Sequence, residues 1–203
     1  MLIQSGKIQI SILMEGNDKM VSLNPPVCDF GWKAPYFNLP GVDDRNWSLT
    51  DLVGENGLLV MFICNHCPYV QAIRERLVAD MATLKMLGIN AVAISSNDVV
   101  SYPEDSLEKM KEVANEFNFG FPYLLDESQA IARAYDAVCT PDFFGFNASL
   151  ELQYRGRFDD QGRDMTPKAN ATKDLMEAMK LVAATGAGPK VQIASIGCSI
   201  KWK

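Results

Sequence analysis

Gly57-Leu-Leu-Val-Met-Phe-Ile-Cys-Asn-His-Cys-Pro-Tyr-Val70 joins an apolar run to a Cys-x-x-Cys pair and then to a helical pattern. The run from Leu58 to Ile63 has the continuous hydrophobicity of a strand that is buried on both faces. After the cysteines, apolar residues recur at spacings of three and four, which places one stripe along a helix: Val70, Ile73, Leu77, Met81 and Leu84. The stretch therefore predicts a buried strand, a turn that holds two cysteines, and a helix.

The position of the two cysteines gives them a physical reason to react. The thiolate is the nucleophile, and the unpaired N–H groups and the dipole at a helix N-terminus stabilise an anion there. His66, the only histidine in the chain, lies between the cysteines and can add positive charge or a hydrogen bond. We expect Cys64, at the exposed mouth of the turn, to attack, and the more shielded Cys67 to resolve the mixed disulfide. Pro68 suits the first helical turn, but the sequence leaves open whether the helix begins at Cys64 or Cys67.

The motif from Phe62 to Val70 resembles the active-site motif of redoxin proteins of the alkyl hydroperoxide reductase/thiol-specific antioxidant type, a thioredoxin-like group. The resemblance implies an α/β fold, a three-layer α/β/α sandwich with a central mixed sheet, an N-terminal hairpin extension and a docked C-terminal tail. It also implies a thiol–disulfide oxidoreductase with an antioxidant role. Cys64, Cys67 and His66 would be its catalytic residues.

The same resemblance implies the partners and the substrate-binding residues. Protein or small-molecule disulfides and dithiols would be the substrates, and a thiol reductant would regenerate the dithiol. No cofactor is implied beyond the Cys64–Cys67 disulfide, and no metal. Asn65 and Pro68, inside the motif, are assigned to substrate binding, together with Thr140 and Pro141 further along the chain.

Composition narrows the class of protein. The chain has 203 residues, of which 48% are hydrophobic, so one domain with a sizeable core is expected. The net charge is −6 with the two signs interspersed, which argues against nucleic-acid binding, and no apolar run approaches the ~20 residues that span a bilayer. Five cysteines without regular spacing, and no signal-peptide pattern, favour a reducing compartment, and we expect the cytoplasm.

The beginning of the chain carries two alternatives. Ile8, Ile10 and Ile12 alternate with polar residues, as in a short strand, whereas the resemblance begins near Leu23 and allows Met20 to be the natural start. We expect residues 1–22 to be an N-terminal extension and residues 23–203 to form a single redoxin domain. Prolines and glycines make 24–56 a loop region with a short hairpin before the first core strand, and Cys28 within it is expected to be a packed residue.

Beyond the first helix, strand and helix patterns alternate, which favours an α/β fold with parallel pairing. We expect strands at 89–94, 122–126, 143–146 and 150–158, the last two joined as a hairpin. Helices are expected from Tyr102, with Pro103 near its first position, at 128–135, and at about 171–184. The acids of 159–164 match no calcium loop, so a solvated turn is expected there.

Two later segments belong to the expected site. In Cys139-Thr-Pro-Asp-Phe-Phe144, the resemblance implies a cis Thr140–Pro141 bond that packs against the Cys-x-x-Cys, with Thr140 pairing with the substrate backbone. The tail from Ser195 to Lys203 also resembles the family and is too apolar to be free, so we expect it to be docked. Cys139 and Cys198 are candidate auxiliary thiols.

Two other functions remain open. Peroxide reduction is implied by the family, but the Pro-x-x-x-Thr-x-x-Cys pattern is missing, because Gly57 and Met61 hold its places before Cys64, and Val60 and Cys64 hold them before Cys67. Copper or zinc binding by a thioredoxin-fold chaperone is a weaker alternative, since the dithiol, His66 and either Cys139 or Cys198 offer soft ligands.

Overall fold

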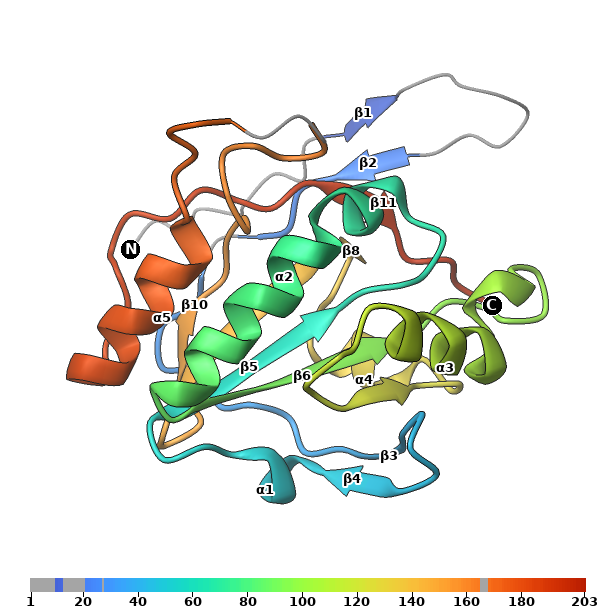
Figure 1. Cartoon of the computed structure of the whole chain (residues 1–203), viewed down its shortest axis with the longest axis horizontal. Helices are drawn as coiled ribbons and strands as arrows, with labels where there is room; N and C mark the ends of the chain where they lie inside the picture. The colour runs from blue at the N-terminus through green and yellow to red at the C-terminus, as the bar shows by residue number, and fades with distance from the viewer. Residues whose placement is uncertain (1–9, 13–20, 27, 165–167) are drawn as a thin grey trace, which may run out of the picture.

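A mixed sheet with the strand order β10-β9-β5-β6-β7 forms the centre of the molecule (Figure 1). The computed structural model describes residues 10–12, 21–26, 28–164 and 168–203. Strand β5 pairs in parallel with β6, and β6 with β7, whereas β9 is antiparallel to β5 and β10 to β9. The α/β class and the central mixed sheet are therefore confirmed.

The helices and strands of the described residues follow one another along the chain as follows: β1 Ile10–Ile12, β2 Val21–Leu23, β3 Asn38–Pro40, β4 Asn46–Ser48, α1 Leu49–Leu52, β5 Gly57–Phe62, α2 Pro68–Met86, β6 Ile89–Ser95, the 3₁₀ turn η1 Pro103–Asp105, α3 Leu107–Glu116, β7 Tyr123–Leu125, α4 Ala130–Ala134, β8 Cys139–Thr140, β9 Asp142–Asn147, β10 Leu152–Tyr154, α5 Asp174–Thr185 and β11 Gly197–Ser199.

Strand β5 shows why a continuous apolar run is needed at the centre of the sheet. Successive side chains of a strand point to opposite faces. Leu59 and Met61 accordingly enter one core cluster with side chains of α2, α3 and α5, and Leu58, Val60 and Phe62 enter a second with side chains of α1 and α4. All six residues of β5 are buried. Helices thus cover both faces, as the three-layer arrangement requires.

Helix α2 lies across one face of the sheet (Figure 1). Each residue of its predicted apolar stripe is buried, from Val70 to Leu84. The helix extends from the end of β5 and returns the chain to β6, its parallel neighbour. This strand–turn–helix connection fixes where the two cysteines lie. Among the described residues, no helix combines the length and the apolar composition that crossing a membrane requires.

A second sheet joins strands from the N-terminal and C-terminal parts of the chain, with the order β1-β2-β11-β8. Its strand β11 confirms that the C-terminal tail is docked, and β1 confirms a strand at Ile10–Ile12. Residues 1–9 and 13–20, and with them most of the predicted extension, lie outside the described residues. The expected domain boundary at residue 23 falls inside β2, which pairs with β11.

Several predicted boundaries differ from the structure. The helix expected from Tyr102 is divided into η1 and α3, because Ser106 has an extended backbone and its Oγ accepts a hydrogen bond from Lys109 N, which starts a new helix. The strand expected over 150–158 is paired only at Leu152–Tyr154. The hairpin β3-β4, the β9-β10 hairpin and the strands β6 and β7 lie where the sequence predicts them.

Candidate functional site

The dithiol occupies the turn between β5 and α2. Helix α2 begins at Pro68 with Cys67 as its N-cap, which answers the question that the sequence left open. Pro68 lies at the first helical position, where its missing N–H costs no helical hydrogen bond. Cys64 therefore precedes the helix, and Cys67 is the cysteine at its N-terminus.

Both sulfurs contact Thr140, the residue before the proline. Cys64 Sγ lies 3.2 Å from Thr140 Oγ1, and Cys67 Sγ donates to Thr140 O over 3.1 Å. The Thr140–Pro141 peptide bond is cis, as predicted. The structure thus brings the Cys-x-x-Cys and the Thr140–Pro141 segment together, although more than seventy residues separate them.

Burial contradicts the expectation that Cys64 lies at an exposed mouth. The exposed fraction is 2% for Cys64 and 0% for Cys67. Burial raises the pKa of the Cys64 thiol, and the hydrogen bond with Cys67 and the negative charge of Asp105 raise it further. For Cys67, burial is outweighed by hydrogen bonds from Cys198 and Cys64, so its pKa is lowered. The surroundings of the two thiols therefore favour ionisation of Cys67 over ionisation of Cys64.

His66 is held by a buried carboxylate. Its Nδ1 lies 2.6 Å from Asp105 Oδ2, and its ring stacks on Tyr102 with 5.2 Å between centroids. Burial lowers the pKa of His66, but the hydrogen bond and charge of Asp105 outweigh it, so the pKa is raised. The Cys64 sulfur, a His66 nitrogen and an Asp105 oxygen all lie within 4.8 Å of one another. The surroundings of His66 consequently favour its protonated form beside the dithiol.

Asp105 organises the turn, and the sequence analysis missed it. Its side chain is fully buried and accepts four hydrogen bonds. Oδ1 accepts from Asn65 N (2.7 Å) and His66 N (3.3 Å), and Oδ2 accepts from His66 Nδ1 (2.6 Å) and Asn97 Nδ2 (2.8 Å). In the sequence Asp105 looks like an ordinary acid in a first helical turn. The available signal was its place after β6, because the carboxyl ends of parallel strands meet at one edge of the sheet.

Asn65 is buried, and its polar groups are turned inward. Its Nδ2 donates to Glu104 O over 2.8 Å, its Oδ1 accepts from Tyr123 Oη over 3.2 Å, and its carbonyl accepts from Arg74 over 3.0 Å. These bonds tie the turn to η1, β7 and α2. Asn65 is placed to hold the turn rather than to meet a substrate. Its assignment to substrate binding, like that of Pro68, stays a prediction.

The two candidate auxiliary thiols lie on neighbouring strands of the second sheet but differ in their contacts. Cys139 is fully buried, its Sγ lies 3.6 Å from Pro141 O, and burial beside Asp142 raises its pKa. Cys198 Sγ lies 3.1 Å from Cys67 Sγ, and the hydrogen bond to Cys67, with burial, raises its pKa. Of the two thiols, Cys198 is therefore the one in contact with the dithiol. None of the five cysteines, all of which lie in the described residues, forms a disulfide.

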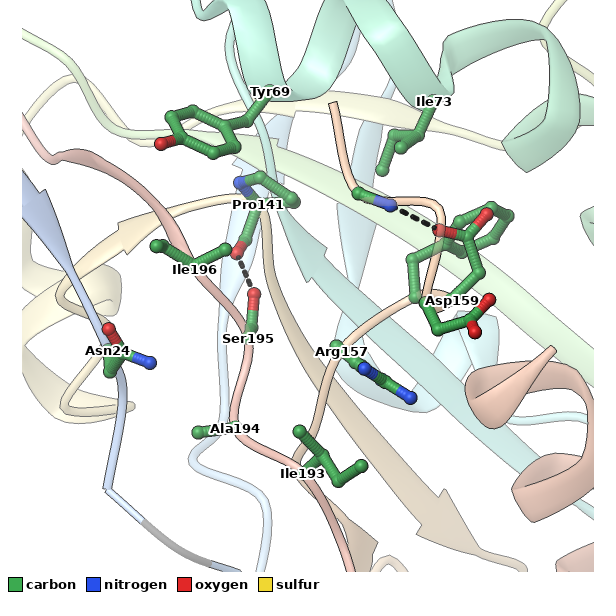
Figure 2. Close-up of a pocket in the computed structure, with 13 residues that line it drawn as sticks. Asn24, Tyr69, Ile73, Pro141, Arg157, Asp159, Ile193, Ala194, Ser195 and Ile196 are labelled. Carbon is green, nitrogen blue, oxygen red and sulfur yellow. Dashed lines mark hydrogen bonds between the residues drawn. The ribbon is translucent and has the colours of Figure 1, made fainter. Parts of the chain in front are cut away.

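A pocket of about 230 Å³ lies beside the cis-proline (Figure 2). Tyr69 and Ile73 of α2 form one side of it, and Pro141 and the tail residues 193–196 form another. Ser195 Oγ donates to Pro141 O over 2.7 Å. The sulfurs do not line this pocket, but Pro141, which does, directly follows Thr140, the residue that both sulfurs contact. The pocket is thus separated from the dithiol by one residue of the chain.

The metal ligands that the structure brings together differ from those that the sequence suggested. Cys64, His66 and Asp105 form a sulfur, nitrogen and oxygen set that would suit a zinc ion with an open position. The predicted set of Cys64, Cys67, His66 and either Cys139 or Cys198 differs from this group, in which Asp105 takes the place of the further thiols. The hydrogen-bonded pair accounts for the arrangement without an ion.

Comparison with known proteins was informative for the family and the fold. The sequence profile described as the AhpC/TSA family matches residues 30–158. An uncharacterized conserved protein from Geobacillus kaustophilus is 41% identical, with a TM-score of 0.84 over 90% of this chain and 96% of that one. A hypothetical protein from Sinorhizobium meliloti is 37% identical, with a TM-score of 0.83 over 89% of this chain and 98% of that one.

A more distant solved structure shows the fold alone. The thioredoxin domain of a thiol–disulfide oxidoreductase from Bacteroides vulgatus is 18% identical, with a TM-score of 0.53 over 62% of this chain and 86% of that chain. A search of curated proteins found no significant match.

Proposed function

We propose that this chain, which belongs to the AhpC/TSA family and has a thioredoxin-like fold, is a thiol–disulfide oxidoreductase that uses Cys64 and Cys67. One observation carries the proposal. Both sulfurs lie within 3.2 Å of the residue before the cis-proline, one on its hydroxyl and one on its carbonyl. A dithiol at a helix N-terminus, held in one place by a single residue, can alternate between thiols and a disulfide.

The reaction proceeds by two exchanges. Cys64 attacks a substrate disulfide, a mixed disulfide forms, and the Cys64 proton ends on the departing substrate sulfur. The Cys67 thiolate then attacks Cys64 Sγ and releases the second substrate sulfur, which leaves a Cys64–Cys67 disulfide. Cys64 is the partner of the substrate because Cys67 is enclosed between Thr140 and Cys198. The lowered pKa of Cys67 suits the resolving step.

His66 and Asp105 position the turn and supply charge. Protonated His66 lies close enough to Cys64 to stabilise negative charge on the sulfur during attack. Asp105 keeps His66 protonated and holds the backbone of residues 65 and 66. Because Cys64 and Cys67 are both buried, the residues around them must move before an external disulfide reaches Cys64.

We expect the Cys64–Cys67 pair to act as an oxidant rather than as a strong reductant. Hydrogen bonds that lower the pKa of Cys67 stabilise the reduced form of the pair, and a more stable reduced form makes the dithiol–disulfide couple more oxidising. We expect a reduction potential above the ~ −270 mV of thioredoxin. Redox titration against glutathione measures it, and a strongly reducing value would contradict this part of the proposal.

Activity of cysteine variants tests the assignment. Wild-type protein should catalyse reduction of a protein disulfide, such as that of insulin, with dithiothreitol as the reductant. Cys64→Ser and Cys67→Ser should each reduce this activity to the uncatalysed rate. Cys28→Ser is the matched control, because Cys28 is half-buried outside the site and should retain the wild-type rate. Full activity in either serine variant of the pair would refute the proposal.

Peroxide reduction is a second candidate for a specific reason. The sequence pattern places no hydroxyl near Cys64, yet the structure places Thr140 Oγ1 3.2 Å from its sulfur. A hydroxyl there can hydrogen-bond a peroxide oxygen. The raised pKa of Cys64 argues against fast attack, because the thiolate is the reactive species. Stopped-flow oxidation by hydrogen peroxide separates the two, since a fast second-order reaction at Cys64 would favour peroxidase function.

The remaining parts of the proposal concern setting. Substrates would be protein or small-molecule disulfides and dithiols, with a thiol reductant as the recycling partner. An antioxidant role and a cytoplasmic location, where thiols stay reduced, agree with five cysteines that form no disulfide. No cofactor is required, because the Cys64–Cys67 dithiol carries the two electrons and becomes a disulfide when it gives them up.

A further inference from the structure

The C-terminal tail is built into the dithiol site. Strand β11 pairs with β8 so that Cys198 lies opposite Thr140 and Ser199 opposite Cys139. Gly197 makes the approach close enough, because a Cβ at this position would lie 2.1 Å from Thr140 O. On either side of the strand, Ser195 Oγ donates to Pro141 O, and Ile200 N donates to Val138 O over 3.1 Å. Four consecutive features thus fix this part of the tail against the segment around the cis-proline.

This pairing takes the place that the sequence analysis reserved for a substrate. Thr140 was expected to pair with the backbone of a bound substrate, and in the structure it pairs with residue 198 of the same chain. The side chain that the tail presents there is a thiol. Its sulfur lies 3.1 Å from Cys67 Sγ, and the Cys198 residue is 2% exposed. The tail therefore occupies the site as a substrate disulfide or dithiol would.

We propose that Cys198 is a third redox thiol, which exchanges with the Cys64–Cys67 disulfide to form a Cys67–Cys198 disulfide. This inference rests on the proposed function and names an internal substrate for it. The S–S bond needs about 2.05 Å, so the two sulfurs must approach by about 1 Å from their contact distance.

The step balances without an outside oxidant. The Cys198 thiol attacks Cys67 Sγ of the Cys64–Cys67 disulfide, the Cys67–Cys198 bond forms, and the Cys64–Cys67 bond breaks. The electron pair leaves with Cys64 Sγ, which takes up the proton that Cys198 loses. One disulfide and one thiol are present before and after. The exchange returns Cys64 to the thiol form that attacks the next substrate, while the tail holds the oxidising equivalents.

Cys139 provides the internal comparison. It lies on β8 next to Thr140, as Cys198 lies opposite it, and both residues are buried. Its sulfur, however, lies against Pro141 O rather than against the dithiol. Cys139 and Cys198 thus both lie beside Thr140 in the sheet, but Cys198 is the one of the two whose sulfur contacts Cys67.

Disulfide mapping in the full chain tests the proposal. Cys64→Ser removes the competing partner and leaves Cys67 with its contact to Cys198. The variant is oxidised with diamide, an azodicarboxamide that accepts the two thiol hydrogens, then denatured, alkylated and digested for mass spectrometry. We expect the peptides of Cys67 and Cys198 to be joined, with loss of the two thiol hydrogens. Cys64→Ser/Cys28→Ser is the matched control and should give the same bond.

The wild-type protein provides a second readout, which remains decisive should Cys64→Ser not fold. After oxidation by one equivalent of diamide, wild-type protein should contain both Cys64–Cys67 and Cys67–Cys198 disulfides, and Cys198→Ser only the first. A Cys64–Cys67 bond in wild type without a Cys67–Cys198 bond overturns the role of Cys198 and leaves the proposed function intact. Absence of every disulfide at Cys67 would instead overturn both.

Discussion

Asp105→Asn should loosen the turn that holds Cys64. The carboxylate accepts two hydrogen bonds on each oxygen, from Asn65, His66 and Asn97. An asparagine at this position keeps one acceptor oxygen. Its NH₂ group replaces the second carboxylate oxygen and faces the two N–H donors that this oxygen accepts from. Two of the four bonds are therefore lost, and an amide hydrogen meets buried N–H groups in their place.

The cost follows from the burial of the carboxylate. Asp105 is fully buried, and the His66 side chain is only 19% exposed. Hydrogen bonds to a charged group contribute ~1.5–3 kcal/mol each, and removing one partner of a buried ion pair costs ~3–5 kcal/mol. We expect Asp105→Asn to lower the free energy of unfolding by about 3–5 kcal/mol. With a urea dependence near 2 kcal/mol per molar, the midpoint should fall by roughly 1.5–2.5 M.

Urea unfolding is the assay, with Glu104→Gln as the matched control. Glu104 is the exposed neighbour of Asp105, undergoes the same chemical change, and bonds to Asn65 through its backbone carbonyl. Its variant should change stability by less than ~0.5 kcal/mol. Equal midpoints for the two variants would refute the role given to Asp105.

The same variants have a spectroscopic readout that a general loss of stability would not move. His66 is the only histidine in the chain, so its ring resonances can be followed by NMR without assignment. Asp105 raises the pKa of His66 by hydrogen bond and charge. The pKa of His66 should therefore fall clearly in Asp105→Asn, and by less in Glu104→Gln, because the charge of Glu104 also raises it but makes a smaller contribution than Asp105. An unchanged value in Asp105→Asn would contradict the ion pair.

Three further predictions concern the same site. The ion pair of His66 and Asp105 should stabilise the fold most between about pH 4 and 6.5. The pKa of His66 is raised on folding, so its contribution to stability is lost as pH rises through the folded-state pKa of His66. The pKa of Asp105 is lowered on folding, so its contribution is lost as pH falls through the folded-state pKa of Asp105. Urea unfolding across pH measures this, and a His66→Gln variant should lose the decline on the alkaline side. Gly197→Ala should destabilise by ~1–3 kcal/mol, because its Cβ would meet Thr140 O at 2.1 Å, whereas the control Gly120→Ala, with nothing within 4 Å, should be nearly neutral; equal unfolding midpoints would contradict the close approach. Thr140→Val should move the alkylation of Cys64 to higher pH, since it removes a hydrogen bond that lowers the Cys64 pKa, and an unchanged pH profile would argue against that contact.

Local patterns were enough to predict the framework. The apolar run of β5 and the stripe of α2 depend on neighbours in the sequence, and both elements lie where periodicity places them. The cis Thr140–Pro141 bond was predicted from resemblance to a family, and the docked tail from its apolar composition. Element ends were less predictable, as the division between η1 and α3 at Ser106 shows, because a single side-chain cap decides them.

Burial and ionisation in the site were not predictable in this way. Cys64 was expected to be exposed, but Thr140, Asp105 and the tail are brought to the dithiol from distant parts of the chain. A pKa depends on every charge, donor and buried surface around a group, whatever its separation in sequence. Asp105 illustrates the limit, since nothing adjacent to it in the chain indicates that it is fully buried.

The order of residues along this chain thus specifies a strand, a Cys-x-x-Cys turn and a helix, because hydrophobic period and turn chemistry act over a few neighbours. Folding in three dimensions settles the rest: which sulfur carries the charge, which carboxylate holds His66, and that Cys198 reaches Cys67. These are contacts between segments as far as 131 residues apart. They arise from the pairing of β11 with β8 and the packing of η1 on the turn, which no local pattern encodes.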